Sequence, residues 1–395
     1  KLVLTAMVLS TLSVFFVFKY LNFLLNQVMG LPEISLGLAV PLGISFFVFK
    51  SISYLADIRR DPETAAAGFA DYLLFISFFP QIVTGPIARF RDFAPQLKNR
   101  TPSLSSAVCG MKRFIAGLGK KLILSGILGA MVDSIFALDK AVLNAPLAWL
   151  GAIGYCLQLY FDFSGYTDMA IGLGLFFGFT TVENFNHPYT ALSIGDFWRR
   201  WHISLSSWFR DYVYIPLGGN RKGMKRQILN LLGVWGLTGF WHGASWNFVL
   251  WGLYYFVLLV FEKYALRVGK DTPLASKIAA RIYVLPAVYI GWLLFRFDNL
   301  SLLWDTVKGI GCANGNAFFD LSAQTTLSGN CIFLVISILA CFPIVPMLAR
   351  LREAKSAPVN VVANAAAAVI PAVLVILSAL ALIGDSYNPF IYFQF

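Results

Sequence analysis

Two histidines that each follow a tryptophan are the residues in this sequence best suited to chemistry. His202 ends the string Trp-Arg-Arg-Trp-His, and His242 stands in Trp-His-Gly between two apolar stretches. A neutral imidazole can take the proton of a hydroxyl group while that hydroxyl attacks a carbonyl carbon. Because an ionisable group is costly to bury among apolar residues unless it is used, we interpret His242 as a general base for acyl transfer. A core histidine bonded to a backbone carbonyl is the alternative interpretation.

The roles of the other two histidines are less sharply indicated. His202 either orients His242 or the substrate, or it only anchors the helix that carries it. His187 stands in Asn-His-Pro-Tyr, a combination typical of turns. We expect His187 to be a loop residue.

Two carboxylates, Asp162 and Asp168, stand among strongly apolar neighbours. Carboxylates inside a membrane mark ion paths, substrate contacts or buried ion pairs. Residues six apart do not share one helical face, so a simple acid/base pair is not expected. We favour structural ion pairs with arginines such as Arg199 or Arg200, and a transport role is the rival hypothesis.

The composition indicates the kind of element that must position these residues. Hydrophobic residues make up 58% of the 395 and charged residues only 13%, against about 25% charged in soluble domains, and the mean hydropathy is +0.70. A helix that spans a bilayer needs roughly 20 apolar residues. We therefore predict an all-α polytopic membrane protein. The predicted segments are 2–25, 36–56, 69–88, 122–138, 146–161, 166–180, 228–240, 245–265, 283–297, 327–349 and 359–384.

The net charge of +11 does not indicate nucleic-acid binding. The basic residues cluster between apolar segments, as at 89–100 and 199–226, rather than along a stripe. The positive-inside rule places such loops in the cytoplasm. The charge is thus explained by the membrane topology, and the sequence contains no motif for a metal site.

Residues 193–226 alternate large aromatic residues with arginines and end in a Gly-rich basic turn. This pattern favours an amphipathic segment at the cytoplasmic interface, which carries His202 near the membrane surface. An interfacial aromatic belt is the simplest explanation for Trp198, Trp201 and Trp208.

The next region, residues 227–265, consists of two apolar arms around Trp-His-Gly-Ala-Ser-Trp-Asn, and both outer ends are basic. If both ends are cytoplasmic, an arm of about 13 helical residues climbs about 20 Å into a hydrocarbon core about 30 Å thick. A broken helix at that depth must be surrounded by protein or line a water-filled cavity. We therefore expect a funnel that ends at His242.

At these residues the sequence resembles the membrane-bound O-acyltransferase family, within it the bacterial branch of the alginate-acetylation type. The resemblance covers essentially the whole chain, and its motifs occur in the family's order. The matching strings are Gln-Leu-Tyr-Phe-Asp-Phe-Ser-Gly-Tyr-Thr-Asp (158–168), Phe-Trp-Arg-Arg-Trp-His (197–202), Arg-Asp-Tyr-Val-Tyr-Ile-Pro-Leu-Gly-Gly-Asn-Arg-Lys-Gly (210–223), Trp-His-Gly (241–243), Pro-Leu-Gly-Ile-Ser (41–45), Gly-Pro-Ile-Ala-Arg-Phe (85–90) and the terminal 388–395.

The resemblance implies a fold and a site. The fold is a ring of about ten tilted or broken transmembrane helices around a central funnel. Residues 1–395 form one such membrane domain, and further N-terminal helices are expected to precede it. His242 is implied to be the catalytic histidine and His202 the second functional histidine. We also predict contacts to substrate or oxyanion from Trp241, Asn247, Asp162 and Asp168.

The resemblance also implies an activity. An acetyl group passes from a cytoplasmic donor, acetyl-CoA, across the bacterial inner membrane toward an extracytoplasmic polysaccharide such as alginate. The transfer is direct or goes through a partner of the SGNH-hydrolase type, and no bound cofactor is implied. Expected contacts to the donor's phosphates are Arg221, Lys222, Lys225 and Arg226.

Two alternatives to this function remain open. The same chemistry on peptidoglycan, cellulose or teichoic acid would use the same residues. A proton-coupled transporter or exporter would use Asp162 and Asp168 instead, although the sequence shows no repeated halves of the kind common in transporters.

Overall fold

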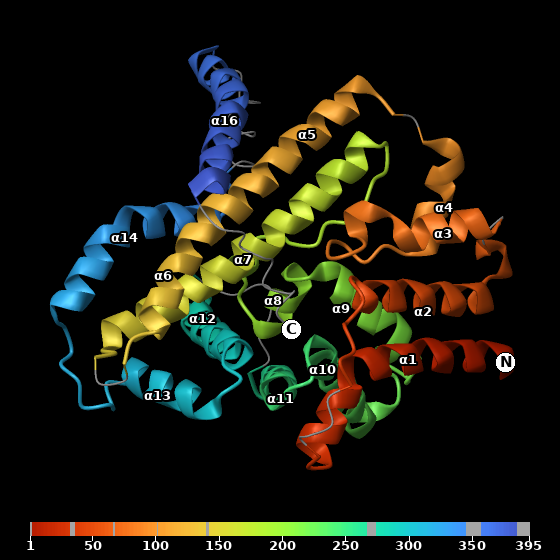
Figure 1. Cartoon of the computed structure of the whole chain (residues 1–395), viewed down its shortest axis with the longest axis horizontal. Coiled ribbons are helices and arrows are strands. Elements are labelled where there is room, and N and C mark those ends of the chain that lie inside the picture. Colours follow the sequence, from red (N-terminus) through yellow and green to blue (C-terminus); the bar gives the residue numbers. More distant parts are fainter. Residues whose placement is uncertain are drawn as a thin grey trace.

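The computed structural model describes residues 2–31, 36–65, 68–100, 102–139, 142–266, 274–344 and 357–384, and the regular elements in these ranges are all helical (Figure 1). The all-α prediction is therefore confirmed for these residues, while the terminal motif at 388–395 lies outside them. The α-helices are α1 (Leu2–Phe23), α2 (Ile44–Arg60), α3 (Phe69–Ser77), α4 (Phe90–Asn99), α5 (Leu104–Gly119), α6 (Gly126–Phe136), α7 (Ala145–Phe176), α8 (Ile194–Arg200), α9 (Ile203–Phe209), α10 (Gly223–His242), α11 (Trp246–Phe261), α12 (Leu274–Arg296), α13 (Leu300–Ile310), α14 (Leu321–Ala340) and α16 (Ala357–Gly384). Shorter π-helical turns are η1 (Leu24–Val28), η4 (Lys120–Ser125), η6 (Arg210–Tyr214) and η7 (Glu262–Leu266), and 3₁₀ turns are η2 (Pro62–Thr64), η3 (Phe79–Gln81) and η5 (Pro188–Thr190).

Within the described residues, six helices are long and apolar enough to cross a membrane. Each of them overlaps a segment predicted from the sequence, so the chain is a multi-pass membrane protein. The ring of about ten helices around a funnel stays a prediction. The six spans are Leu2–Val28, Leu104–Phe136, Trp246–Leu266, Lys277–Arg296, Leu321–Ala340 and Asn364–Gly384.

Three of the predicted segments have other bounds in the structure. Segments 146–161 and 166–180 form one helix, α7, whose start is capped by the Asn144 side chain accepting from the Leu147 N–H. Segment 69–88 ends its α-helix at Ser77 and continues into η3, because Pro80 lacks an N–H and opposes helix continuation. Helix α7, with 32 residues, is therefore longer than either segment predicted for it. Helix α3, with 9 residues, is too short to cross a bilayer.

Helix α5 continues through η4 into α6, and α7 packs along both of them across the molecule (Figure 1). Helices α7 and α5 approach closely where glycines face each other: Gly110 lies opposite Gly172, and Gly117 lies opposite Gly165. A methyl group added at Gly110 or at Gly172 would lie 2.5 Å from the carbonyl oxygen of the other glycine. Small residues at such crossings let helix backbones approach closely in a membrane.

Helices α10 and α11 form the hairpin predicted for residues 227–265, and His242 is the last residue of its first arm. The arms touch at Gly239 and Gly252, where an added methyl group would collide with the backbone of the opposite helix. The depth of the turn in the membrane stays a prediction.

This contact predicts different effects for two glycines of α10. We expect Gly239→Ala to lower the stability of the detergent-solubilised protein by about 1–3 kcal/mol, because the new methyl group overpacks the hairpin. The matched control is Gly236→Ala, since nothing lies within 4 Å of a methyl group there. Thermal unfolding checks the prediction, and equal melting temperatures for the two variants would contradict it.

Candidate active site

His242 lies in an aromatic enclosure at the end of α10. Its residue exposure is 6%. Its ring centroid lies 4.6 Å from that of Trp241, 4.9 Å from Trp251 and 5.1 Å from Phe295. Three helices, α10, α11 and α12, thus supply the rings around the histidine that the sequence singled out.

Helix α1 holds the backbone on which His242 stands. The Lys19 ammonium group donates hydrogen bonds to the carbonyl oxygens of Trp241 (2.8 Å) and His242 (3.2 Å). The Tyr20 hydroxyl donates to the carbonyl of Phe240, and the two rings stack at 4.1 Å. A helix leaves its last carbonyls without intrahelical partners, and a cation near that end is favourable. Lys19 and Tyr20 therefore cap α10 and fix the main chain of His242.

Sequence reasoning missed this cap. A signal was present, because Lys19 is the one charged residue in the apolar stretch 2–28. An ionisable residue within a membrane helix is a candidate functional residue by default.

His202 is held by a second polar contact, at the break between α8 and α9. Its backbone is left-handed, with φ of 45°. Its Nδ1 lies 3.1 Å from Asn184 Oδ1, which also accepts from the N–H (3.0 Å) and the hydroxyl (2.8 Å) of Ser204. A backbone N–H can only donate, so the amide atom in contact is the oxygen. His202 Nδ1 must then carry a proton.

The other ring nitrogen of His202, Nε2, is buried and has no hydrogen-bond partner among the described residues. His202 lies outside the six candidate spans, and its burial lowers its pKa to about 3. The imidazole is therefore neutral at pH 7, and Nε2 holds a lone pair that accepts a proton or a hydrogen bond.

Trp241 connects the two histidines. Its ring lies 4.6 Å from that of His242 and 6.3 Å from that of His202. The indole N–H is buried without a hydrogen-bond partner in the described part of the chain. The structure thus brings together His202, His242 and Trp241, and the indole N–H of Trp251, 4.9 Å from His242 between ring centroids, is likewise buried without a partner among the described residues.

Asn247 lies near this group but faces α12. Its amide nitrogen donates to the carbonyls of Leu294 and Phe295, both at 3.3 Å. The contact ties the start of α11 to α12. An oxyanion contact by Asn247 stays a prediction, and it would require the amide to leave those carbonyls.

The two carboxylates of α7 form ion pairs, but not with the expected arginines. Asp162 pairs with Lys121, and Asp168 contacts Lys120 (2.6 Å) and Arg113 (2.9 Å). The π-helical turn η4 directs its two successive lysines at the two carboxylates. Arg199 and Arg200 instead contact Asp196 within their own helix, at 3.6 and 3.0 Å. The predicted partners were therefore wrong, while both carboxylates do form ion pairs.

The segment 193–226 also differs from its prediction. It is not one amphipathic helix, because the chain breaks at His202 and widens into the π-helical turn η6. Trp198, Trp201 and Trp208 are buried, so the interpretation as an interfacial belt was wrong. His187, as predicted, is a loop residue, and its Nδ1 lies 3.1 Å from the Cys341 carbonyl oxygen.

The four basic residues expected to contact the donor lie at the opposite end of α10 from His242. They are exposed, and Arg226 and His242 are separated by 16 helical residues, or about 24 Å. This set comprises Arg221, Lys222, Lys225 and Arg226.

The cap by Lys19 predicts a local effect. We expect Lys19→Met to speed amide hydrogen exchange in residues 240–246, because two buried carbonyls lose their donor. The matched control is Lys50→Met, since buried Lys50 donates in the same way to the Phe75 carbonyl (3.0 Å) in α3. Equal exchange at 240–246 in both variants, measured by mass spectrometry, would contradict the prediction.

Comparison with known proteins relates this geometry to a family. The family model described as the membrane-bound O-acyltransferase family matches residues 4–302. The chain is 38% identical over 425 aligned residues to a protein of Azotobacter vinelandii named probable alginate O-acetylase, covering 99% of this chain and 84% of the relative.

Two further relatives carry different names. A Helicobacter pylori protein named peptidoglycan O-acetyltransferase is 38% identical over 341 residues, covering 78% of this chain and 64% of that one. A Bacillus subtilis protein named teichoic acid D-alanyltransferase is 33% identical over 240 residues, covering 56% and 60%. Because the family model spans most of the chain, and a relative at 38% identity is matched along almost all of it, the chain belongs to the membrane-bound O-acyltransferase family.

Proposed function

We propose that this membrane O-acyltransferase transfers acetyl groups in the bacterial inner membrane, from cytoplasmic acetyl-CoA toward an extracytoplasmic polysaccharide such as alginate. The observation that carries the proposal is the contact of His242, Trp241 and neutral His202. Relatives named probable alginate O-acetylase, at 38–44% identity, support acetyl as the acyl group and alginate as the acceptor.

In the proposed reaction His242 acts as general base. The acceptor hydroxyl attacks the thioester carbonyl, its proton passes to His242, and the C–S bond breaks. The departing thiolate takes the proton back, so that the histidine is regenerated. In a two-step variant His242 itself attacks and carries the acetyl group to the acceptor.

The tautomer of His202 changes the role expected for it. With Nδ1–H donated to Asn184, neutral His202 offers only an acceptor at Nε2, and an acceptor cannot stabilise an oxyanion. We infer that His202 positions the acceptor by accepting a hydrogen bond from a second, neighbouring hydroxyl of the sugar, because the attacking hydroxyl gives its only proton to His242. The Trp241 N–H, buried and unpartnered among the described residues, is the donor better suited to the developing oxyanion.

The acceptor is the part of the proposal that the fold constrains least. Relatives with names for three different acceptors align with this chain, so membership of the family does not select one of these acceptors. We propose transfer to the glycan either directly or through an SGNH-type partner outside the membrane.

The transporter hypothesis finds less support in the contacts. It needs Asp162 and Asp168 to take up and release protons. Both carboxylates are paired with cationic side chains of α5 and η4, which favours a structural role.

The first prediction concerns the histidines. In membranes that express the protein with its genomic neighbours, we expect His242→Ala to lower transfer of labelled acetyl from acetyl-CoA to glycan by about 100-fold or more. His187→Ala, a loop histidine, is the control at matched protein levels. Undiminished labelling by the His242 variant would move the chemistry to another protein.

The second prediction concerns the indole N–H. Trp241→Phe keeps an aromatic ring but removes the donor, so we expect kcat to fall by about 100-fold with little change in donor KM. Trp208→Phe is the control, because the Trp208 N–H already donates to the Phe49 carbonyl (3.1 Å) in the same aromatic cluster. A larger loss of kcat in the control than in the Trp241 variant would rule out the proposed donor.

A further inference from the structure

Glu262 is the buried acid of the candidate membrane spans. The six spans contain two acidic residues, the exposed Asp133 and Glu262, whose exposure is 7%. Glu262 begins the π-helical turn η7, directly after α11. An ionisable residue inside a membrane helix is a candidate functional residue, and its partner indicates the role. The contacts of Glu262 therefore need an explanation.

The partner of Glu262 is the start of helix α8. Its two carboxylate oxygens accept hydrogen bonds from the N–H groups of Ile194 (2.5 Å) and Gly195 (2.8 Å). The next N–H, that of Asp196, donates to the Ser193 hydroxyl (2.8 Å). The first N–H groups of a helix have no intrahelical partners, and negative charge is favourable beside them. Glu262 therefore fixes the first turn of a helix that lies 67 positions away in the chain.

Helix α8 leads directly to the second histidine. It has seven residues, which rise about 10 Å, and it ends two residues before His202. The Trp201 N–H donates to the Phe197 carbonyl (2.9 Å), and the two rings stack at 5.7 Å. Both rings are buried, and a close-packed interior transmits strain. A shift at the first turn of α8 is therefore passed to His202.

Helix α11, which leads to Glu262, also reaches the first histidine. The ring of Trp251 lies 4.9 Å from that of His242 and 5.5 Å from that of Trp198 in α8. From Trp251 to Glu262 the helix rises about 16 Å. Helix α11 thus contacts His242 near its start and holds α8 at its end, and it links the two histidines.

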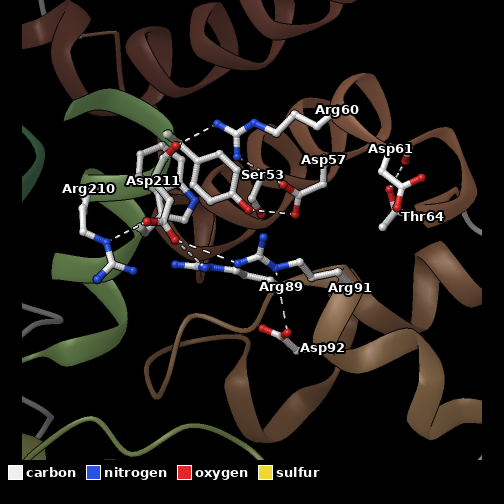
Figure 2. A network of polar contacts seen from close by, with 12 residues as sticks. Ser53, Asp57, Arg60, Asp61, Thr64, Arg89, Arg91, Asp92, Arg210 and Asp211 are labelled. Atoms are coloured by element: carbon white, nitrogen blue, oxygen red, sulfur yellow. Dashed lines mark hydrogen bonds and ion pairs between the residues drawn. The ribbon is translucent and has the colours of Figure 1, made fainter. Parts of the chain in front are cut away.

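The far end of the segment that carries His202 is held by several contacts at once. Figure 2 shows Asp211 of η6 between Arg210 and Arg89, at 2.7 and 2.6 Å. Arg60 also donates to the Asp211 carbonyl (2.7 Å). Loss of one of these contacts leaves the others in place. The first two N–H groups of α8, by contrast, share one carboxylate.

We propose that Glu262 is a positioning residue for acyl transfer, which sets the place of His202 through α8. The inference rests on the proposed function. Because the carboxylate is directed at backbone N–H groups, its effect on the reaction passes through the histidine.

Hydrogen exchange, measured by mass spectrometry, tests the positioning without turnover. Glu262→Gln keeps the shape of the side chain but replaces one acceptor oxygen by an amide group that only donates. We expect exchange about tenfold faster in residues 194–196. The same increase is expected at Ile203 and Ser204, whose N–H groups donate to Asn184 (both 3.0 Å).

The matched control comes from the same π-helical turn. Tyr264→Phe removes the hydrogen bond from the Tyr264 hydroxyl to the Gln227 side chain (3.0 Å), which does not involve α8. We expect this variant to exchange as the parent does throughout residues 194–204.

A double-variant cycle tests the link to the reaction. We expect Glu262→Gln to lower acetyl transfer to glycan by about tenfold or more at matched protein levels, because misplaced groups position the acceptor poorly. In a His202→Ala background the same substitution should have little further effect, since residues that act as a unit are non-additive. Glu262→Asp keeps the carboxylate and should retain more activity than Glu262→Gln.

Several results would overturn the proposal. Faster exchange confined to 194–196 would make Glu262 a local helix cap. Losses of transfer that multiply with those of His202→Ala would mean that Glu262 acts without the histidine. If Glu262→Gln fails to insert, Glu262→Asp, whose carboxylate is drawn back by one methylene, takes its place in the exchange measurement. Exchange at 203–204 equal to that of the parent would then overturn the proposal.

The exchange measurement also separates this inference from the proposed function. A parent that transfers no acetyl group, together with faster exchange at 203–204 in Glu262→Gln, would refute the function and leave the positioning of His202 by Glu262 intact.

Discussion

The hydrogen bonds from α1 to the end of α10 are the interaction on which the site depends most. The last carbonyls of α10 are buried, and an unsatisfied buried carbonyl is costly. Lys19 and Tyr20 satisfy three of them, while Gly239 lets α11 approach closely from the other side. These contacts fix the main chain of His242, and side chains of α10, α11 and α12 surround its ring.

The second histidine is positioned by different means. A single amide oxygen of Asn184 binds the ring of His202 and both the N–H and the hydroxyl of Ser204. This contact stabilises a left-handed residue and selects one tautomer. His202 therefore offers a fixed hydrogen-bond acceptor. Trp241, whose ring lies near both histidines, offers an indole N–H donor.

What the sequence could predict was local. The apolar arms around Trp-His-Gly predicted the hairpin and the burial of His242, because both depend on hydrophobic pattern alone. Lys19 contacts a carbonyl 222 positions further along the chain, and Asn184 contacts a histidine 18 positions further along. No local sequence pattern encodes such contacts. For the same reason the carboxylates of α7 were recognised as paired while their partners were not.

The central claim is that His202 and His242 act in one site. The most direct test is a double-variant cycle, in which acetyl transfer to glycan is measured for each single alanine variant and for the double variant at matched protein levels. Groups that act as a unit are strongly non-additive. The account predicts that the double variant is about as slow as the slower single variant. Losses that multiply would mean that the two histidines act independently, and the shared site would be contradicted.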